Sequence, residues 1–291
     1  MAIVLGPNRY GKAEIHLVRV NRGADRDEIR DLTVSVELTG DMTEVHLTGD
    51  NAAVLPTDTQ KNTVFAFAAE HGVGDIESFA LRLARHFVDS QPAVGTARVS
   101  VAEQPWDRTG DGGHSFARRG GEASTATVSY DGTAAWAVSG LSRLTLLNTA
   151  GSEFRGYIKD RYTTLAETSD RILATDVNAR WRHTAVPPEK GAGSWNVSRA
   201  QTRRLLVETF AGHRSRSLQQ TLYAMGRRVL AERPEIAEIR LSLPNKHHFP
   251  VDLAPFGLPN RNEVFYAADR PYGLIEGTVI RDDAPPAGLA W

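Results

Sequence analysis

The order in which strand-like and helix-like patterns follow one another most constrains the fold of this chain. Alternating apolar and polar residues predict strands over 13–20 and, more cleanly, over 32–38. Two helical stretches follow, and the second begins at Asp75, a residue type that caps helix N-termini. An Asp131-Gly132 pair between two strand-like runs then predicts a hairpin. The first half therefore has the order strands, helices, strands.

The second half repeats this order. The predicted elements are strands over 141–147 and 176–183, helices over 196–210 and 217–233, and strands over 236–243 and 263–279. The helix over 217–233 is the best marked, because Ser217 and Gln220 form a capping box and Pro234 stops it. The sequence thus predicts an α+β fold of two similar units, residues 1–140 and 141–291, each with an antiparallel sheet and helices on one face.

Three shorter segments carry weaker patterns. The alternation over 44–48 predicts a short strand, and Thr164-x-x-Glu167 predicts a capped helical turn. The Gly-rich stretch 110–121 predicts an exposed loop, to which the sequence assigns no role.

Composition narrows the classes of protein. The net charge of −1 gives no basic field that would favour nucleic acid or an anionic membrane, and no apolar run is long enough to span a bilayer. The chain has no cysteine, which excludes disulfides, thiolate zinc sites and iron–sulfur clusters. A cytoplasmic globular protein is therefore expected.

One motif near the start resembles a phosphate-binding loop. Residues 6–12 match GxxxxGK, but Ala13 stands where a hydroxyl would hold Mg²⁺. A strand pattern follows the motif where a helix is required, so nucleotide binding is not expected. On its own, Lys12 is a charged residue beside a turn.

The histidines do not form a recognisable metal site. No HExxH is present, and His247 and His248 are adjacent, so a strand turns them to opposite faces. Asn245 and His247 share a face. Taken alone, this pattern also fits an edge strand with polar groups in solvent.

The start of the helix over 217–233 is a second candidate site. The backbone N–H groups of Leu218 and Gln219 lie in its first turn, beside the positive end of the helix dipole. Such a position can bind an anion, and the Gln219 amide can both donate and accept. The alternative is an ordinary helix start exposed to water. Arg171, considered alone, would likewise be an ordinary surface arginine.

Taken together, these segments resemble one family, the urate oxidases. The matching motifs are YGKAEIHLVRV (10–20), TDTQKNTV (57–64), GSEFRGYIKDRYTTL (151–165), TSDRILATDV (168–177), SLQQTLY (217–223), SLPNKHHF (242–249) and NEVFYAADRPYGLIE (262–276). The resemblance covers about 4–279 and weakens over 110–123, over 184–198 and in the C-terminal tail.

The resemblance implies a tunnelling fold: two tandem units per chain, with four chains forming a barrel whose active sites lie between subunits. It implies that Lys12, Thr57 and His247 are catalytic and that no cofactor or metal is used. The implied substrate-binding residues are Thr57, Asp58, Phe154, Arg171, Leu218, Gln219 and Asn245. Leu218 stands where a valine is more usual, which matters little because its backbone N–H is the binding group.

The implied reaction is oxidation of urate by O₂ and water to 5-hydroxyisourate and hydrogen peroxide. Asp58 is expected to contribute its backbone N–H, because its carboxylate would repel the urate anion. Lys12, in its neutral form, would act as a base through Thr57. Two alternatives remain: a zinc-dependent pterin or purine enzyme of the same fold, and a non-catalytic purine-binding protein.

Overall fold

A single eight-stranded antiparallel sheet organises the computed structural model, which describes residues 1–186 and 194–291. The order of the strands in the sheet is β1-β2-β3-β6-β7-β8-β9-β12. Their bounds are β1 Tyr10–Asn21, β2 Glu28–Gly40, β3 Val94–Gln104, β6 Ala123–Tyr130, β7 Ala135–Asn148, β8 Leu173–His183, β9 Ile236–Lys246 and β12 Gly273–Ile280. Two small hairpins project from the sheet, β4 (Trp106–Arg108) with β5 (Phe116–Arg118), and β10 (His248–Pro250) with β11 (Phe265–Ala267).

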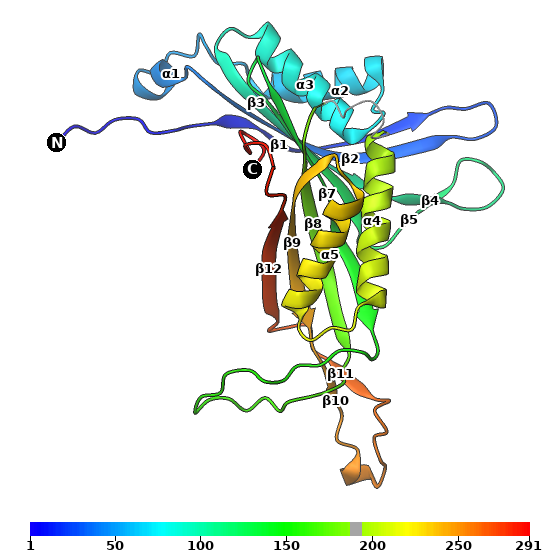
Figure 1. Cartoon of the computed structure of the whole chain (residues 1–291). Coiled ribbons are helices and arrows are strands. Elements are labelled where there is room, and N and C mark those ends of the chain that lie inside the picture. Colours follow the sequence, from blue (N-terminus) through cyan, green and yellow to red (C-terminus); the bar gives the residue numbers. More distant parts are fainter. Residues whose placement is uncertain (187–193) are drawn as a thin grey trace.

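The helices divide between the two halves of the sheet (Figure 1). They are α1 Thr43–Leu47, α2 Thr57–His71, α3 Ile76–Ser90, α4 Trp195–Gly212 and α5 Leu218–Glu232, with a 3₁₀ turn, η1, at Ala254–Phe256. Helices α2 and α3 pack on the early strands, and α4 and α5 pack on the later ones. The predicted α+β fold with an antiparallel sheet and helices is confirmed. No helix in the described ranges has the length and apolar character needed to cross a membrane.

Each half of the sheet has its own apolar core. In the first, Phe79 and Phe87 on the predicted face of α3 are fully buried where this helix packs on β3 and β6, in a cluster that includes Val34 of β2. In the second, Met225 and Val229 of α5 are fully buried where this helix packs on β9 and β12. Burying each of these large side chains stabilises the fold by about 1.5–3 kcal/mol. The two cores explain why both helices could be predicted from their 3.6-residue period.

Two short predicted elements are wrong. Residues 44–48 form most of α1 instead of a strand, because no neighbouring strand pairs with them and His46 bonds to the Met42 carbonyl, 2.6 Å away, within the turn. The segment from Thr164 to Glu167 forms no helix. The Glu167 carboxylate is paired with Lys159 Nζ at 2.9 Å, so it does not serve as the capping group that the motif requires.

Two longer predictions need correction. The strand expected over 263–279 is two strands, β11 and β12, separated by 268–272, and Pro271 in this gap has no N–H to donate to a ladder. β11 pairs with β10 instead of joining the large sheet. The Gly-rich 110–121 stretch is mostly exposed, as predicted, but its residues 116–118 form β5.

The element order repeats once along the chain. β1, β2, α2, α3, β3 and β6 are followed by β7, β8, α4, α5, β9 and β12 in the same pattern. The repeat starts after the turn at 131–134, whereas the predicted boundary between residues 140 and 141 falls inside β7. The division into units 1–140 and 141–291 stays a prediction.

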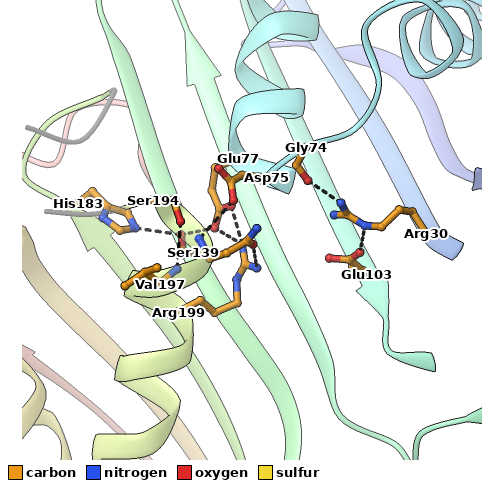
Figure 2. A network of polar contacts seen from close by, with 11 residues as sticks. Arg30, Gly74, Asp75, Glu77, Glu103, Ser139, His183, Ser194, Val197 and Arg199 are labelled. Carbon is orange, nitrogen blue, oxygen red and sulfur yellow. Dashed lines mark hydrogen bonds and ion pairs between the residues drawn. The ribbon is translucent and has the colours of Figure 1, made fainter. Parts of the chain in front are cut away.

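A buried polar network joins the two halves (Figure 2). Glu77 of α3 is fully buried and paired with Arg199 of α4 at 2.5 Å. The Ser139 hydroxyl of β7 donates to Glu77 at 2.5 Å and lies 2.9 Å from His183 Nε2 of β8. Burial, and then the charges of two nearby arginines, lower the pKa of His183 to about 3, so its ring is neutral. This network connects elements from both predicted units.

Candidate active site

A small cavity of about 140 Å³ gathers most of the predicted substrate-binding residues. Its lining is Phe154, Leu165, Arg171, Leu218, Gln219, Asn245, His247 and Ile275. A larger neighbouring cavity of about 530 Å³ shares Phe154, Leu165, Arg171, Asn245 and His247 with it. The residues come from the loop after β7, the start of α5, the end of β9 and β12, so they meet only through the tertiary fold.

Phe154 and Arg171 lie on the same long loop and are held by backbone contacts. Phe154 pairs with Thr168 in an isolated antiparallel bridge, and Arg171 N donates to the Ser152 carbonyl at 2.8 Å. These contacts place the Arg171 guanidinium 5.1 Å from the centre of the Phe154 ring. The Phe154 ring also stacks on Tyr157, with centroids 4.8 Å apart and planes 13° from parallel. The cavity therefore has one flat aromatic wall beside one cation.

Arg171 is the cation that the cavity offers to a ligand. Its Nε atom is buried and makes no hydrogen bond within the described part of the chain. Burial lowers the pKa of the guanidinium, although an arginine stays charged near neutral pH. A buried donor without a partner is costly, so an acceptor placed here by a ligand would be favoured.

The start of α5 forms a second wall. Ser217 caps the helix, and its hydroxyl accepts from Gln220 N at 3.2 Å. The reciprocal bond differs from the predicted capping box, because Gln220 Oε1 accepts from Arg216 N at 3.0 Å instead of from the Ser217 N–H. Leu218 is buried and Gln219 is exposed, which leaves the Gln219 amide available at the cavity.

The end of β9 supplies the third wall. Leu243 and residues of the same parity are buried, and both Asn245 and His247 line the cavity, as the strand alternation predicts. His248 does not line the small cavity, but it lines the larger one together with His247, so the predicted separation of the two rings holds only for the small cavity. Its Nδ1 lies 3.1 Å from the Lys246 carbonyl oxygen. Burial, followed by the charges of Arg171 and His248, lowers the pKa of His247. His247 is therefore a neutral ring at pH 7 that can accept a proton.

The predicted first-half residues form a separate group around the start of α2. Thr57 is the first residue of α2, and Tyr10 ties the preceding loop to β1 because its hydroxyl accepts from Leu55 N at 3.0 Å. Lys12 lies where the β1–β2 register shifts. A side chain on Gly11 would come within 1.8 Å of the Val36 carbonyl oxygen, so only glycine fits beside Lys12.

The Asp58 carboxylate is engaged by its own helix. It accepts from Lys61 Nζ at 2.5 Å and Asn62 Nδ2 at 3.0 Å. The Lys61 hydrogen bond and charge are the main causes that lower the pKa of Asp58, and Lys12 adds a smaller electrostatic contribution. That Asp58 offers its backbone N–H to a ligand stays a prediction, and Lys12 lies within electrostatic range of the start of α2.

Within one chain the two groups of residues do not share a cavity. Lys12, Thr57 and Asp58 are absent from the linings of both cavities described above. Figure 1 shows β1 and α2 in the upper part of the molecule, whereas the loop after β7 and the β10–β11 hairpin lie at the lower end.

Three residues of the site were not singled out in the sequence. Leu165 and Ile275 line the small cavity, and Tyr157 supports the Phe154 ring. Leu165 and Tyr157 belong to an irregular loop with no periodicity that could indicate their direction. Among the residues that the structure describes, no group of three or more histidine or acidic side chains could hold a metal ion.

The fold is α+β, an antiparallel sheet backed by paired helices. Its small cavity combines an aromatic ring, an arginine and a helix start. The family model described as Uricase matches residues 8–129 and 137–276. The chain belongs to the uricase family.

Individual relatives agree over nearly the full length. A uricase of Arthrobacter globiformis is 51% identical over 289 residues, covering 99% of this chain and 94% of the relative, and one of Danio rerio is 36% identical over 286 residues, covering 94% and 93%. The crystal structure of the Arthrobacter globiformis uricase superposes with a TM-score of 0.93 at 50% identity, covering 98% of each chain.

Proposed function

We propose that this chain oxidises urate with O₂ and water to 5-hydroxyisourate and hydrogen peroxide, and that urate binds in the small cavity. Membership of the uricase family over nearly the whole chain is the observation that carries the proposal. The cavity supports it independently, because it brings together Phe154, Arg171 and Gln219 from two distant segments.

Each binding group suits one feature of urate. The planar guanidinium of Arg171 can grip one amide-like edge of the anion through two hydrogen bonds. Gln219 can match an N–H beside a C=O on another edge, and the Leu218 N–H adds a donor at the positive end of α5. Phe154 can stack on the purine plane and fix its tilt.

The reaction needs proton transfer and a place for O₂ and water above the ring. Urate supplies the electrons: O₂ is reduced to hydrogen peroxide, while a water-derived hydroxyl adds to C5 of the oxidised ring. Asn245 lies on the strand face that carries His247 and can hold O₂ and then water. The neutral His247 can accept a proton, and Lys12 with Thr57 completes the relay.

Completing this relay requires a second copy of the chain. Lys12 and Thr57 lie apart from the cavity within one chain, so we propose that they reach the cavity of a neighbouring copy across a two-fold interface. In this proposal four chains form a barrel, with each active site shared by two of them. Exposed apolar side chains near the cavity, including Phe249 (48% exposed) and Tyr266 (64% exposed), support an interface at this end.

A direct assay tests the proposed function. Purified protein is mixed with urate, and O₂ uptake, loss of urate absorbance and peroxide release are followed together. Equal molar O₂ uptake and urate loss is expected, with His247→Ala as the impaired control. Failure of the pure, correctly assembled protein to consume urate would refute the proposal.

A further inference from the structure

The short stretch 151–154, which carries Phe154, joins two other segments that carry proposed urate ligands: the one that leads into α5 and the one that leads to Arg171. On one side, Ser215 N donates to the Gly151 carbonyl at 3.0 Å and Glu153 N donates to the Ser215 carbonyl at 2.8 Å. Ser152 and Ser215 thus form a parallel bridge. On the other side, Phe154 pairs with Thr168. The stretch therefore lies between the segment that leads into α5 and the one that leads to Arg171.

Ser215 has a further contact that no backbone bridge requires. Its hydroxyl accepts from Thr221 Oγ1 at 2.8 Å and donates to the Ser217 carbonyl at 3.1 Å. Both Ser215 and Thr221 are 1% exposed, so this pair is shielded from water. Thr221 lies one turn into α5, directly after Gln220, whose N–H is capped by Ser217.

These contacts have different consequences for the start of α5. The Ser217 cap satisfies an amide of the first turn but does not fix where that turn lies relative to Phe154 and Arg171. Ser215 can fix that position, because its backbone is paired with the 151–154 stretch while its hydroxyl is bonded to Thr221 of the helix and to the Ser217 carbonyl. A shift of the first turn by a fraction of an ångström would misalign Leu218 N and Gln219 with the other two ligands.

We propose that the buried Ser215–Thr221 hydroxyl pair is a positioning device that holds the first turn of α5 in register with Phe154 and Arg171, and so sets the affinity for urate. The proposal rests on the proposed function, since it assigns a role within that binding site. Neither residue is expected to touch the substrate, because neither lines the cavity.

The test compares four variants with wild type. Thr221→Val keeps the shape and removes the hydroxyl, Thr221→Ser restores a hydroxyl, and Ser215→Ala removes the other partner. The matched control is Thr202→Val in α4, where Thr202 is fully buried and its hydroxyl makes no hydrogen bond in the described structure. For each protein we would measure kcat and KM for urate, the Kd of the purine anion 8-azaxanthine, and the Tm.

Loss of the pair should raise KM and Kd by about 5-fold, the effect of one buried hydrogen bond, with a smaller change in kcat. Thr221→Ser should restore both constants to near wild type, and Thr202→Val should leave them unchanged. If Thr221→Val does not fold, the same increase is expected for Ser215→Ala.

Two results would overturn the inference. One is an unchanged KM and Kd in both Thr221→Val and Ser215→Ala, even if the Tm falls, because that would describe a purely structural pair. The other is an equal increase in Thr202→Val. A wild-type protein that neither binds the purine nor oxidises urate would refute the proposed function as well, whereas an active wild type with unaffected variants refutes only this inference.

Discussion

Replacing Arg171 by alanine is the sharpest test of the proposed binding site. The guanidinium is half-buried, carries a buried Nε without a hydrogen-bond partner, and lies beside the Phe154 ring. Removing one charged, desolvated partner of a ligand typically costs ~2–5 kcal/mol. Because Arg171 is only partly buried in the chain, a value near the middle of that range, about 3 kcal/mol, is expected. At ~1.4 kcal/mol per tenfold change, this is roughly a 140-fold loss of affinity.

The assay is titration of purified Arg171→Ala with 8-azaxanthine, a purine anion used as an inert probe of the site. Arg161→Ala is a matched control, since Arg161 lies on the same loop and stacks on Tyr162 at 4.6 Å, but does not line the cavity. The control should bind as wild type does. A Kd for Arg171→Ala within about 3-fold of wild type would show that the guanidinium does not contact the bound anion, and would refute Arg171 as a ligand-binding residue.

Three further predictions follow from the site and the fold. His247→Ala should lower kcat by roughly 10²-fold, as expected for a positioned proton-transfer group, and His248→Ala should cost far less; equal losses would contradict the assigned faces. Metal-stripped protein should oxidise urate at the full rate, and activity that vanishes with EDTA and returns with one metal would contradict cofactor-free chemistry. His183 has a folded-state pKa of about 3, below its usual 6.5, so the unfolded chain binds a proton that the fold excludes. The free energy of unfolding should therefore be highest above pH 6.5 and fall toward pH 3, and His183→Gln should flatten that slope in denaturant titrations; an unchanged slope would contradict the buried neutral ring.

The longer elements could be predicted because local pattern and tertiary packing agree in them. α3 and α5 each have a 3.6-residue apolar stripe and a core that buries that stripe. Ser217 caps α5, whereas Asp75 stands at the N-cap position of α3 without a side-chain cap bond. In β2 the apolar residues of the alternating pattern are the buried ones, on the face of the sheet that forms the core. The predictions for 44–48 and 263–279 are wrong because whether a segment forms a strand there depends on its pairing partner, which a single sequence does not reveal.

In the candidate site, too, only the residues that belong to a regular local pattern could be predicted from that pattern. Asn245 and His247 share a face by strand alternation alone, and the start of α5 was marked by its cap. Phe154 and Arg171 lie on a loop with no periodicity, so only the family resemblance pointed to them. Their approach depends on bridges between 151–154 and two distant segments, and such contacts leave no local signal in the sequence.

The central claim is that Lys12 and Thr57 of one chain complete the cavity of another, and a hybrid assembly tests it most directly. Co-expressed chains carrying Lys12→Ala or Arg171→Ala would assemble at random. A site would be intact only when its first-half residues come from the Arg171 variant and its cavity from the Lys12 variant. For equal mixing the chance is 1/2 × 1/2, so the whole purified mixture of oligomers should recover about 25% of wild-type urate oxidation. Verified hybrid oligomers with activity no higher than either parent would contradict the shared site.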